Sequence, residues 1–350
     1  MGNLTGTTLS GQYFLRELAG SGGMADVYLA WDKHRTHWMA IKVLRQDLTN
    51  NERFLEQFST EAEIYRQLNH PNIVRFYEFR QDAGNMYFVM DWVEGSDLRT
   101  AIRNSRDPLP FSFIVQILQA ICPALHYAHT LDKNHRIFHC DVKPANIMLQ
   151  IDGKILLTDF GVANLASRTS SGGTPPYMAP EQFSGGKIDA RTDIYAMGIT
   201  LYEIISGGKT PYRGETASSR GTTPKERIEW EHLNLPPPPL EQFNANVPPD
   251  LAEVVYTAIN KNPDRRYSTM LAFRDAFITA WMKCGGEIES NNQGAVDITS
   301  LAQGKQFHPA NRTVTMDAQV VGQDSRNFPP PHPTGEDLPG AILSAIKKFT

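Results

Sequence analysis

The residues best suited to chemistry in this sequence lie in two short blocks near its middle. The blocks read HCDVKPAN at residues 139–146 and DFG at residues 159–161. Asp141 can accept a hydrogen bond from a substrate hydroxyl and aim its oxygen at phosphorus. Asn146 and Asp159 carry the hard oxygen atoms that magnesium prefers, and Lys143 can neutralise charge that develops on a phosphoryl group in transfer. Together they indicate phosphoryl transfer, although each residue alone could be a turn residue or a helix cap.

A glycine-rich segment near the N-terminus is a second candidate for phosphate binding. It reads LAGSGGMADV at residues 18–27 and lies between two predicted strands, which argues against a Rossmann or Walker loop, where a helix would follow. Glycines let backbone N–H groups approach phosphate oxygens, so a strand-turn-strand hairpin can fold over a nucleotide. An ordinary glycine-rich hairpin would be the better interpretation if this segment stood alone.

A lysine on an apolar strand needs an anionic partner. Lys42 follows Ala40-Ile41 in such a strand, where an unpaired ammonium would be costly to desolvate. The helical segment that follows offers Glu61, with Glu63 as a competing partner one face away. Solvated surface charges are the alternative interpretation of these residues.

Composition restricts the class of protein. The chain has 350 residues, of which 41% are apolar, so it can bury a large core. Its formal net charge of −4 provides no field that would gather nucleic acid or an anionic membrane, and we expect neither as a partner. The cysteines, Cys122, Cys140 and Cys284, are too few and too scattered for a disulfide framework or a zinc site, which favours a reducing compartment.

No targeting segment is recognisable in the sequence. The N-terminal residues MGNLTGTT lack an apolar signal core and depart from the myristoylation pattern at Gly6. We also expect no window with the roughly 18–20 apolar residues that a membrane helix requires. The chain is accordingly expected to be soluble and cytoplasmic.

Hydrophobic periodicity divides the chain into two lobes and a tail. Five aromatic and β-branched runs between Gln12 and Met90 predict a small, mostly antiparallel sheet, with one helix at about 51–68. Helical patterns then dominate, at 111–131, 193–206 and 251–260. We predict an α+β domain over 1–284, with an N-lobe at about 11–91, a hinge at 92–95 and a C-lobe at 96–284, and a flexible low-complexity tail at 285–350.

A run of four prolines, Pro236–Pro239, lies between helical patterns of the C-lobe. Such runs are usually stiff connectors. A polyproline ligand for a partner protein is the alternative interpretation.

The motifs occur in the order found in one family. With GTPPYMAPE at residues 173–181, they make the chain resemble a eukaryotic-type protein kinase, and most closely the serine/threonine kinases of bacteria, from about Gly11 to Met282. The resemblance implies a bilobal protein-kinase fold, with ATP and magnesium, or manganese in its place, as cofactors. It further implies serine or threonine hydroxyls of proteins as acceptors, autophosphorylation and a part in intracellular signalling.

Site residues follow from the resemblance, position by position. The expected catalytic residues are Asp141, Lys143, Lys42 and Glu61, and the expected metal ligands are Asn146 and Asp159. Lys42 would hold the α- and β-phosphates of ATP and pair with Glu61. The glycines would cover the phosphates, apolar side chains would enclose adenine with Met90 as gatekeeper, and Asp97 would lie near the ribose. The residues expected around ATP are Leu18, Gly20, Ser21, Gly22, Gly23, Val27, Ala40, Lys42, Met90, Asp91, Val93, Asp97 and Met148.

The resemblance also implies features of the second lobe. Glu181 would pair with Arg266, and Asp193 would brace the catalytic loop. Lys143 and the segment GTPPYMAPE favour serine and threonine over tyrosine as acceptors. A pseudokinase scaffold would lack a catalytic residue, and a kinase of small molecules would lack the APE segment. Neither alternative fits the residues present.

Two residues depart from the family pattern. Ala25 replaces the third glycine of the hairpin, a mild change. Cys140 stands where many kinases have an arginine that binds a phosphorylated activation loop. We therefore predict that activity does not depend on phosphorylation of Thr169, Ser170, Ser171 or Thr174 through that arginine. Cys140 itself is either a small buried filler, the favoured interpretation, or an oxidant sensor.

Overall fold

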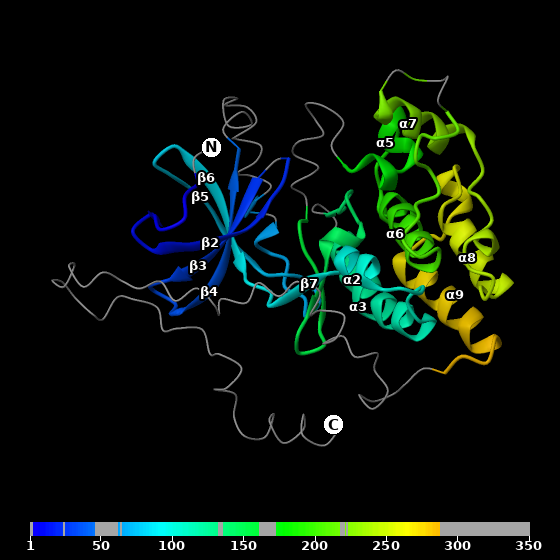
Figure 1. Ribbon diagram of the computed structural model, residues 1–350, viewed down its shortest axis with the longest axis horizontal. Helices are drawn as coiled ribbons and strands as arrows, with labels where there is room; N and C mark the ends of the chain where they lie inside the picture. Colours follow the sequence, from blue (N-terminus) through cyan, green and yellow to red (C-terminus); the bar gives the residue numbers. More distant parts are fainter. Residues whose placement is uncertain are drawn as a thin grey trace.

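A computed structural model of the chain shows how these segments are arranged. The residues that it describes are 3–23, 25–45, 62–63, 65–131, 136–160, 173–217, 221 and 223–287. Figure 1 shows a strand-rich lobe on the left, a helix-rich lobe on the right, and β7 of a small second sheet between them. This is the bilobal α+β arrangement that the sequence predicts.

The strand-rich lobe contains a six-stranded antiparallel sheet with the strand order β1-β2-β3-β4-β6-β5. Its strands are β1 (Thr8–Leu9), β2 (Tyr13–Ser21), β3 (Ala25–Asp32), β4 (His37–Leu44), β5 (Phe76–Asp82) and β6 (Asn85–Asp91). The five longer strands confirm the five predicted runs, and the short β1 is an addition. The predicted helix at 51–68 lies mostly outside the described residues.

Strand β4 is apolar almost throughout, and the two faces of the sheet use its residues differently. Met39, Ile41 and Val43 pack into an outer core with aromatic residues of β2, β3 and β6. Side chains alternate along a strand, so Ala40 and Lys42 point to the opposite face. Lys42 is consequently buried on the side of the sheet away from this aromatic core.

A second sheet of three short strands places the two chemistry-bearing blocks next to each other. It consists of β7 (Gly95–Asp97), β8 (Ile147–Gln150) and β9 (Ile155–Leu157), in that order and antiparallel. The first block ends directly before β8, and the second begins two residues after β9. Ile147 pairs with Leu157, and N–H of Thr158 donates to the carbonyl oxygen of Asn146 at 2.9 Å. The β8–β9 hairpin thus brings residues that are distant in the sequence to one edge.

The helix-rich lobe packs around α6, a helix buried over its whole length from Thr192 to Ile205. Its helices are α2 (Leu98–Asn104), α3 (Phe111–His129), α5 (Pro180–Ser184), α6 (Ala190–Ile205), α7 (Pro224–Asn234), α8 (Pro249–Ala258) and α9 (Met270–Lys283). A Cβ at Gly198 would lie 2.7 Å from Ile259 and 2.9 Å from Ala258, so this glycine allows the chain at the end of α8 to approach α6 closely. The helical patterns predicted from the sequence correspond to α3, α6 and α8.

Helix α3 corrects one expectation. Its 19 residues are long and apolar enough to span a membrane by length and composition, although no such window was expected. Most of its apolar side chains, including Ile117, Leu118 and Leu125, are fully buried in the lobe's core. The composition of α3 therefore reflects its place between other helices.

The ion pair expected between Glu181 and Arg266 is present in the core of this lobe. Two guanidinium nitrogens of Arg266 donate to the carboxylate of Glu181 at 2.7 and 2.9 Å, and the hydroxyl of Thr192 donates to the same carboxylate at 2.9 Å. The side chain of Arg266 is fully buried and that of Glu181 is 8% exposed. Because the two charges neutralise each other away from water, removal of one leaves the other uncompensated.

We predict that Arg266→Met lowers the free energy of unfolding by about 3–5 kcal/mol, since it leaves the carboxylate of Glu181 buried without a partner. Guanidinium denaturation of the purified chain measures this change. The control is Lys154→Met, which breaks an exposed pair with Asp152 and should cost less than about 1 kcal/mol. Equal stabilities of the two variants would contradict the assignment.

Candidate active site

Asp141 lies at the centre of a hydrogen-bonded group. Its Oδ1 accepts from the backbone N–H of Thr174 at 3.0 Å and from the Thr174 hydroxyl at 2.8 Å. Its Oδ2 accepts from Nζ of Lys143 at 2.6 Å, and this ammonium also donates to the Thr174 hydroxyl at 2.5 Å. The structure therefore brings the predicted residues Asp141 and Lys143 together and fixes the orientation of the carboxylate.

Asp193, on α6, holds the loop that carries Asp141. Its fully buried carboxylate accepts hydrogen bonds from the backbone N–H groups of His139 and Cys140 at 2.8 and 2.7 Å, and it contacts Nε2 of His129 at 2.7 Å. Burial acts to raise the pKa of this carboxyl, but the hydrogen bond and charge of His129 outweigh it, so the pKa lies below its usual value. The bracing contact implied by the resemblance is present.

Lys42 and Asp159 form an ion pair that joins the two lobes. Nζ of Lys42, on β4, lies 2.7 Å from Oδ1 of Asp159, which follows β9. Burial tends to raise the pKa of Asp159, and the neighbouring charge of Lys42 lowers it below its usual value. Asp159 therefore stays an anion. The expected partner of Lys42, Glu61, lies outside the described residues, and that pairing stays a prediction.

The donor set around Asp159 fits a magnesium ion that shares its ligands with phosphates. Asn146 uses its Nδ2 to donate to the carbonyl oxygen of Asp141 at 2.8 Å, which leaves its Oδ1 as an acceptor. Among the described residues, no group of three or more histidine, cysteine or acidic side chains forms a complete cage. Magnesium is usually bound in this way, by one or two protein oxygens together with phosphate oxygens and water. A site made of protein ligands alone suits it less well.

The glycine-rich segment forms the turn between β2 and β3. Gly20 pairs with Val27, and N–H of Gly22 donates to the carbonyl oxygen of Ala25 at 2.9 Å. Gly20, Ser21, Gly22 and Gly23 are exposed. Val27 in turn pairs with Lys42, so the hairpin lies beside the strand that carries the lysine. Its backbone N–H groups can reach phosphate oxygens near Lys42.

The residues expected around adenine lie on neighbouring strands. Ala40 pairs with Met90 across β4 and β6. Asp97 pairs with Met148 across β7 and β8. Leu18 lies two residues before Gly20 on β2 and is half-buried. The strand register thus places Ala40 beside Met90 in the first sheet and Asp97 beside Met148 in the second.

Two residues that flank the expected hinge, Asp91 and Asp97, have structural partners of their own. Asp91 accepts a hydrogen bond from the hydroxyl of Tyr77 at 2.8 Å, and Val93 is buried. The carboxylate of Asp97 caps α2 by accepting from N–H of Thr100 at 2.7 Å. Asp97 therefore serves as a helix cap in this structure, and its ribose contact stays a prediction.

A small cavity of about 40 Å³ lies behind the expected gatekeeper. Its lining includes Met90, Phe88, Asp159 and Phe160. The ring of Phe160 also contacts that of His139, with centroids 4.7 Å apart. Phe160, in the block at residues 159–161, thus packs against His139 of the block at residues 139–146.

Sequence reasoning missed two supporting residues of this site. His139 accepts from N–H of Asp141 at Nδ1 (3.2 Å), and its Nε2 lies 2.9 Å from the carbonyl oxygen of Thr158. Gln182 donates to the carbonyl oxygen of Cys140 at 3.1 Å. The order of the blocks in the sequence does not predict such contacts, because they depend on how the loop lies against the end of β9 and against α5.

Cys140 is buried, with 6% of its surface exposed, which supports its interpretation as a small filler. Its backbone has a φ of +62°, a conformation that residues other than glycine rarely adopt. The hydrogen bonds to Asp193 and Gln182 hold it there. Thr169, Ser170 and Ser171 lie outside the described residues.

Comparison with known proteins agrees with this geometry. Residues 13–278 match the family described as the protein kinase domain. The chain is 36% identical to the serine/threonine-protein kinase PrkC of Bacillus subtilis over 272 residues, covering 76% of this chain and 40% of the relative. It is 35% identical to PknB of Mycobacterium tuberculosis over 282 residues, covering 77% of this chain and 43% of the relative. The crystal structure of the Mycobacterium tuberculosis PknI kinase domain is similar with a TM-score of 0.64 and 29% identity, covering 79% of this chain and 98% of that one.

The chain therefore belongs to the protein kinase family and has the bilobal fold of that family. Its curated relatives are serine/threonine kinases of bacteria, as the resemblance predicts, and the chain spans about two fifths of their length. The site described above is therefore the active site of a protein kinase domain.

We predict that Thr174→Val reduces kcat/KM for a protein substrate by about tenfold to a hundredfold, because it removes a hydrogen bond to the charged Asp141, worth roughly 1.5–3 kcal/mol. Thr174→Ser keeps the hydroxyl and should stay within about threefold of the wild type. Steady-state rates at saturating ATP measure both variants. Equal activity of the valine variant and the wild type would show that the hydroxyl has no part in positioning Asp141.

Proposed function

We propose that the whole protein is an active kinase that transfers the γ-phosphoryl group of ATP to serine and threonine hydroxyls of other proteins and of itself. The observation that carries this proposal is the hydrogen-bonded group of Asp141, Lys143 and Thr174 beside the Lys42–Asp159 ion pair. A scaffold that only binds nucleotide has no need of a carboxylate held in one orientation by an ammonium and a hydroxyl.

Each side chain has a distinct task in this reaction. The hydroxyl of the substrate donates to Asp141, which orients its oxygen for attack on the γ-phosphorus and accepts the proton as the new P–O bond forms. Lys143 neutralises the charge that develops on the transferred group while the bond to the ADP oxygen breaks. Lys42 binds the α- and β-phosphates. Magnesium, held by Asn146 and Asp159 when bound, would neutralise charge on the phosphates.

We also propose that the reaction takes place in the cytoplasm, as part of intracellular signalling. No disulfide joins Cys122, Cys140 or Cys284, and proteins without disulfides are typical of a reducing compartment. ATP is available in the same compartment. Protein substrates follow from the family, and the side chains at the site favour serine and threonine among them.

Asp141→Asn should reduce turnover by roughly 10² to 10⁴, because an amide can neither accept the proton nor bind Lys143 as an ion pair. The assay incubates the purified chain with labelled ATP, magnesium and a generic basic protein, and then identifies the labelled amino acid. Label on serine or threonine from the wild type, lost in the variant, supports the proposal. Thermal stabilisation of the wild type by ATP without any transfer would instead identify a pseudokinase.

A triple variant, Thr169→Ala with Ser170→Ala and Ser171→Ala, should keep its activity within about tenfold of the wild type. The physical reason is that Cys140 cannot form the charge-assisted hydrogen bonds by which an arginine binds a phosphorylated loop. Initial rates after phosphatase treatment of both proteins test this. A larger loss, above roughly 1.4 kcal/mol in the activation free energy, contradicts the prediction.

A further inference from the structure

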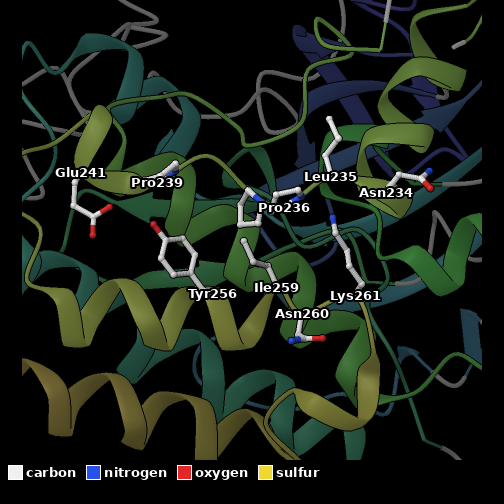
Figure 2. Close-up of a pocket in the computed structure, with 10 residues that line it drawn as sticks. Asn234, Leu235, Pro236, Pro239, Glu241, Tyr256, Ile259, Asn260 and Lys261 are labelled. Atoms are coloured by element: carbon white, nitrogen blue, oxygen red, sulfur yellow. The ribbon is translucent and has the colours of Figure 1, made fainter.

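A cavity of about 550 Å³ lies in the helix-rich lobe and shares no residue with the active site. It is formed by the segment after α7, by α8 and by the loop after α8. Figure 2 shows the side chains that line it, which are Asn234, Leu235, Pro236, Pro237, Pro239, Glu241, Tyr256, Ile259, Asn260 and Lys261. A volume of this size suits a small organic molecule.

The proline run keeps one wall of this cavity in a fixed position. Its rings restrict the backbone, and the carbonyl oxygen of Pro238 accepts from the hydroxyl of Tyr202 at 2.9 Å. Leu240, directly after the run, donates its N–H to the hydroxyl of Tyr256 at 2.7 Å. The cavity is therefore preformed, and a ligand would not have to order this segment.

Lys261 supplies an unusual charge at one end of the cavity. Its Nζ is buried and has no hydrogen-bond partner among the described residues. The ammonium lies 3.8 Å from the centroid of the Tyr212 ring, a contact that compensates only part of the lost hydration. In Figure 2 the Lys261 side chain extends toward the segment that carries Asn234 and Leu235.

Among the residues that the structure describes, no nearby anion neutralises this ammonium. Arg266 donates to the carbonyl oxygen of Lys261 and adds a second positive charge, and its own partner is Glu181. His232 packs on the ring of Tyr212 and is neutral, because burial lowers its pKa to about 3. Glu241 lies at the opposite end of the cavity in Figure 2. Burial, and to a smaller extent the charge of Arg266, lowers the pKa of Lys261 to about 7.

We propose that this cavity binds a small organic carboxylate, with the carboxylate on the ammonium of Lys261 and an apolar body against the prolines, Ile259 and Tyr256. The apolar walls and the buried ammonium, which has no hydrogen-bond partner in the described part of the chain, together define the ligand class. This site is separate from the proposed phosphoryl transfer and does not depend on it.

The test compares 2-naphthylacetate with its uncharged analogue 2-naphthylacetamide, by calorimetry on the full chain at pH 8 in two buffers of different ionisation enthalpy. We expect the carboxylate to bind at least tenfold more tightly than the amide. Lys261 is mostly neutral at pH 8, so binding of the carboxylate should also take up a proton. Equal affinities of the two compounds, or no binding of the carboxylate, would overturn the proposal.

Variants then locate the binding site. Lys261→Met should bring the affinity for the carboxylate down to that for the amide and abolish proton uptake, while its binding of the amide shows that the cavity is intact. Lys154→Met, at an exposed lysine, and Lys42→Met, at the lysine of the nucleotide site, should leave both affinities unchanged. Loss of carboxylate binding in Lys42→Met would assign the compound to the nucleotide site and overturn the proposal. If Lys261→Met fails to fold, the comparison of the two compounds on the wild type still decides.

Discussion

The contact on which the rest of the site depends is the ion pair between Lys42 and Asp159, whose charged atoms lie 2.7 Å apart. One residue belongs to the sheet of the first lobe and the other follows the small sheet of the second, so the pair links the two lobes at the site. The charge of Lys42 also keeps Asp159 ionised against the effect of its burial. A nucleotide bound between the lobes would meet a cation and a metal-binding anion already aligned.

In the second lobe, a rigid helix fixes the position of the loop that carries Asp141. Helix α6 is buried along nearly its whole length, and Asp193 near its start binds two successive N–H groups of the loop before Asp141. The orientation of Asp141 is then completed by Lys143 and Thr174. The backbone of the loop is thus fixed by a fully buried carboxylate, which is how a loop can hold a catalytic group as firmly as a helix would.

Much of this could be predicted from the sequence, for physical reasons that also set the limit. The alternation of side chains along strands such as β4 predicts the sheet of the first lobe. The order of the two blocks identifies Asp141 and Asp159, because phosphoryl transfer requires these particular side chains. The contact of Lys42 with Asp159 could not be predicted, because it depends on how two lobes close, and sequence proximity favoured Glu61. The burial of the Lys261 ammonium could not be predicted either, since a lysine is usually exposed and only the folded structure places this ammonium over the ring of Tyr212, away from water.

Cys140 shows why a family position can lose its usual side chain while the loop keeps its shape. The strained φ of +62° is held from both sides, by Asp193 on the N–H and by Gln182 on the carbonyl oxygen. Neither contact uses the side chain at this position. An arginine there would add a link to a phosphorylated loop without being needed for the backbone geometry. The catalytic loop of this chain is therefore held in place by buried backbone contacts.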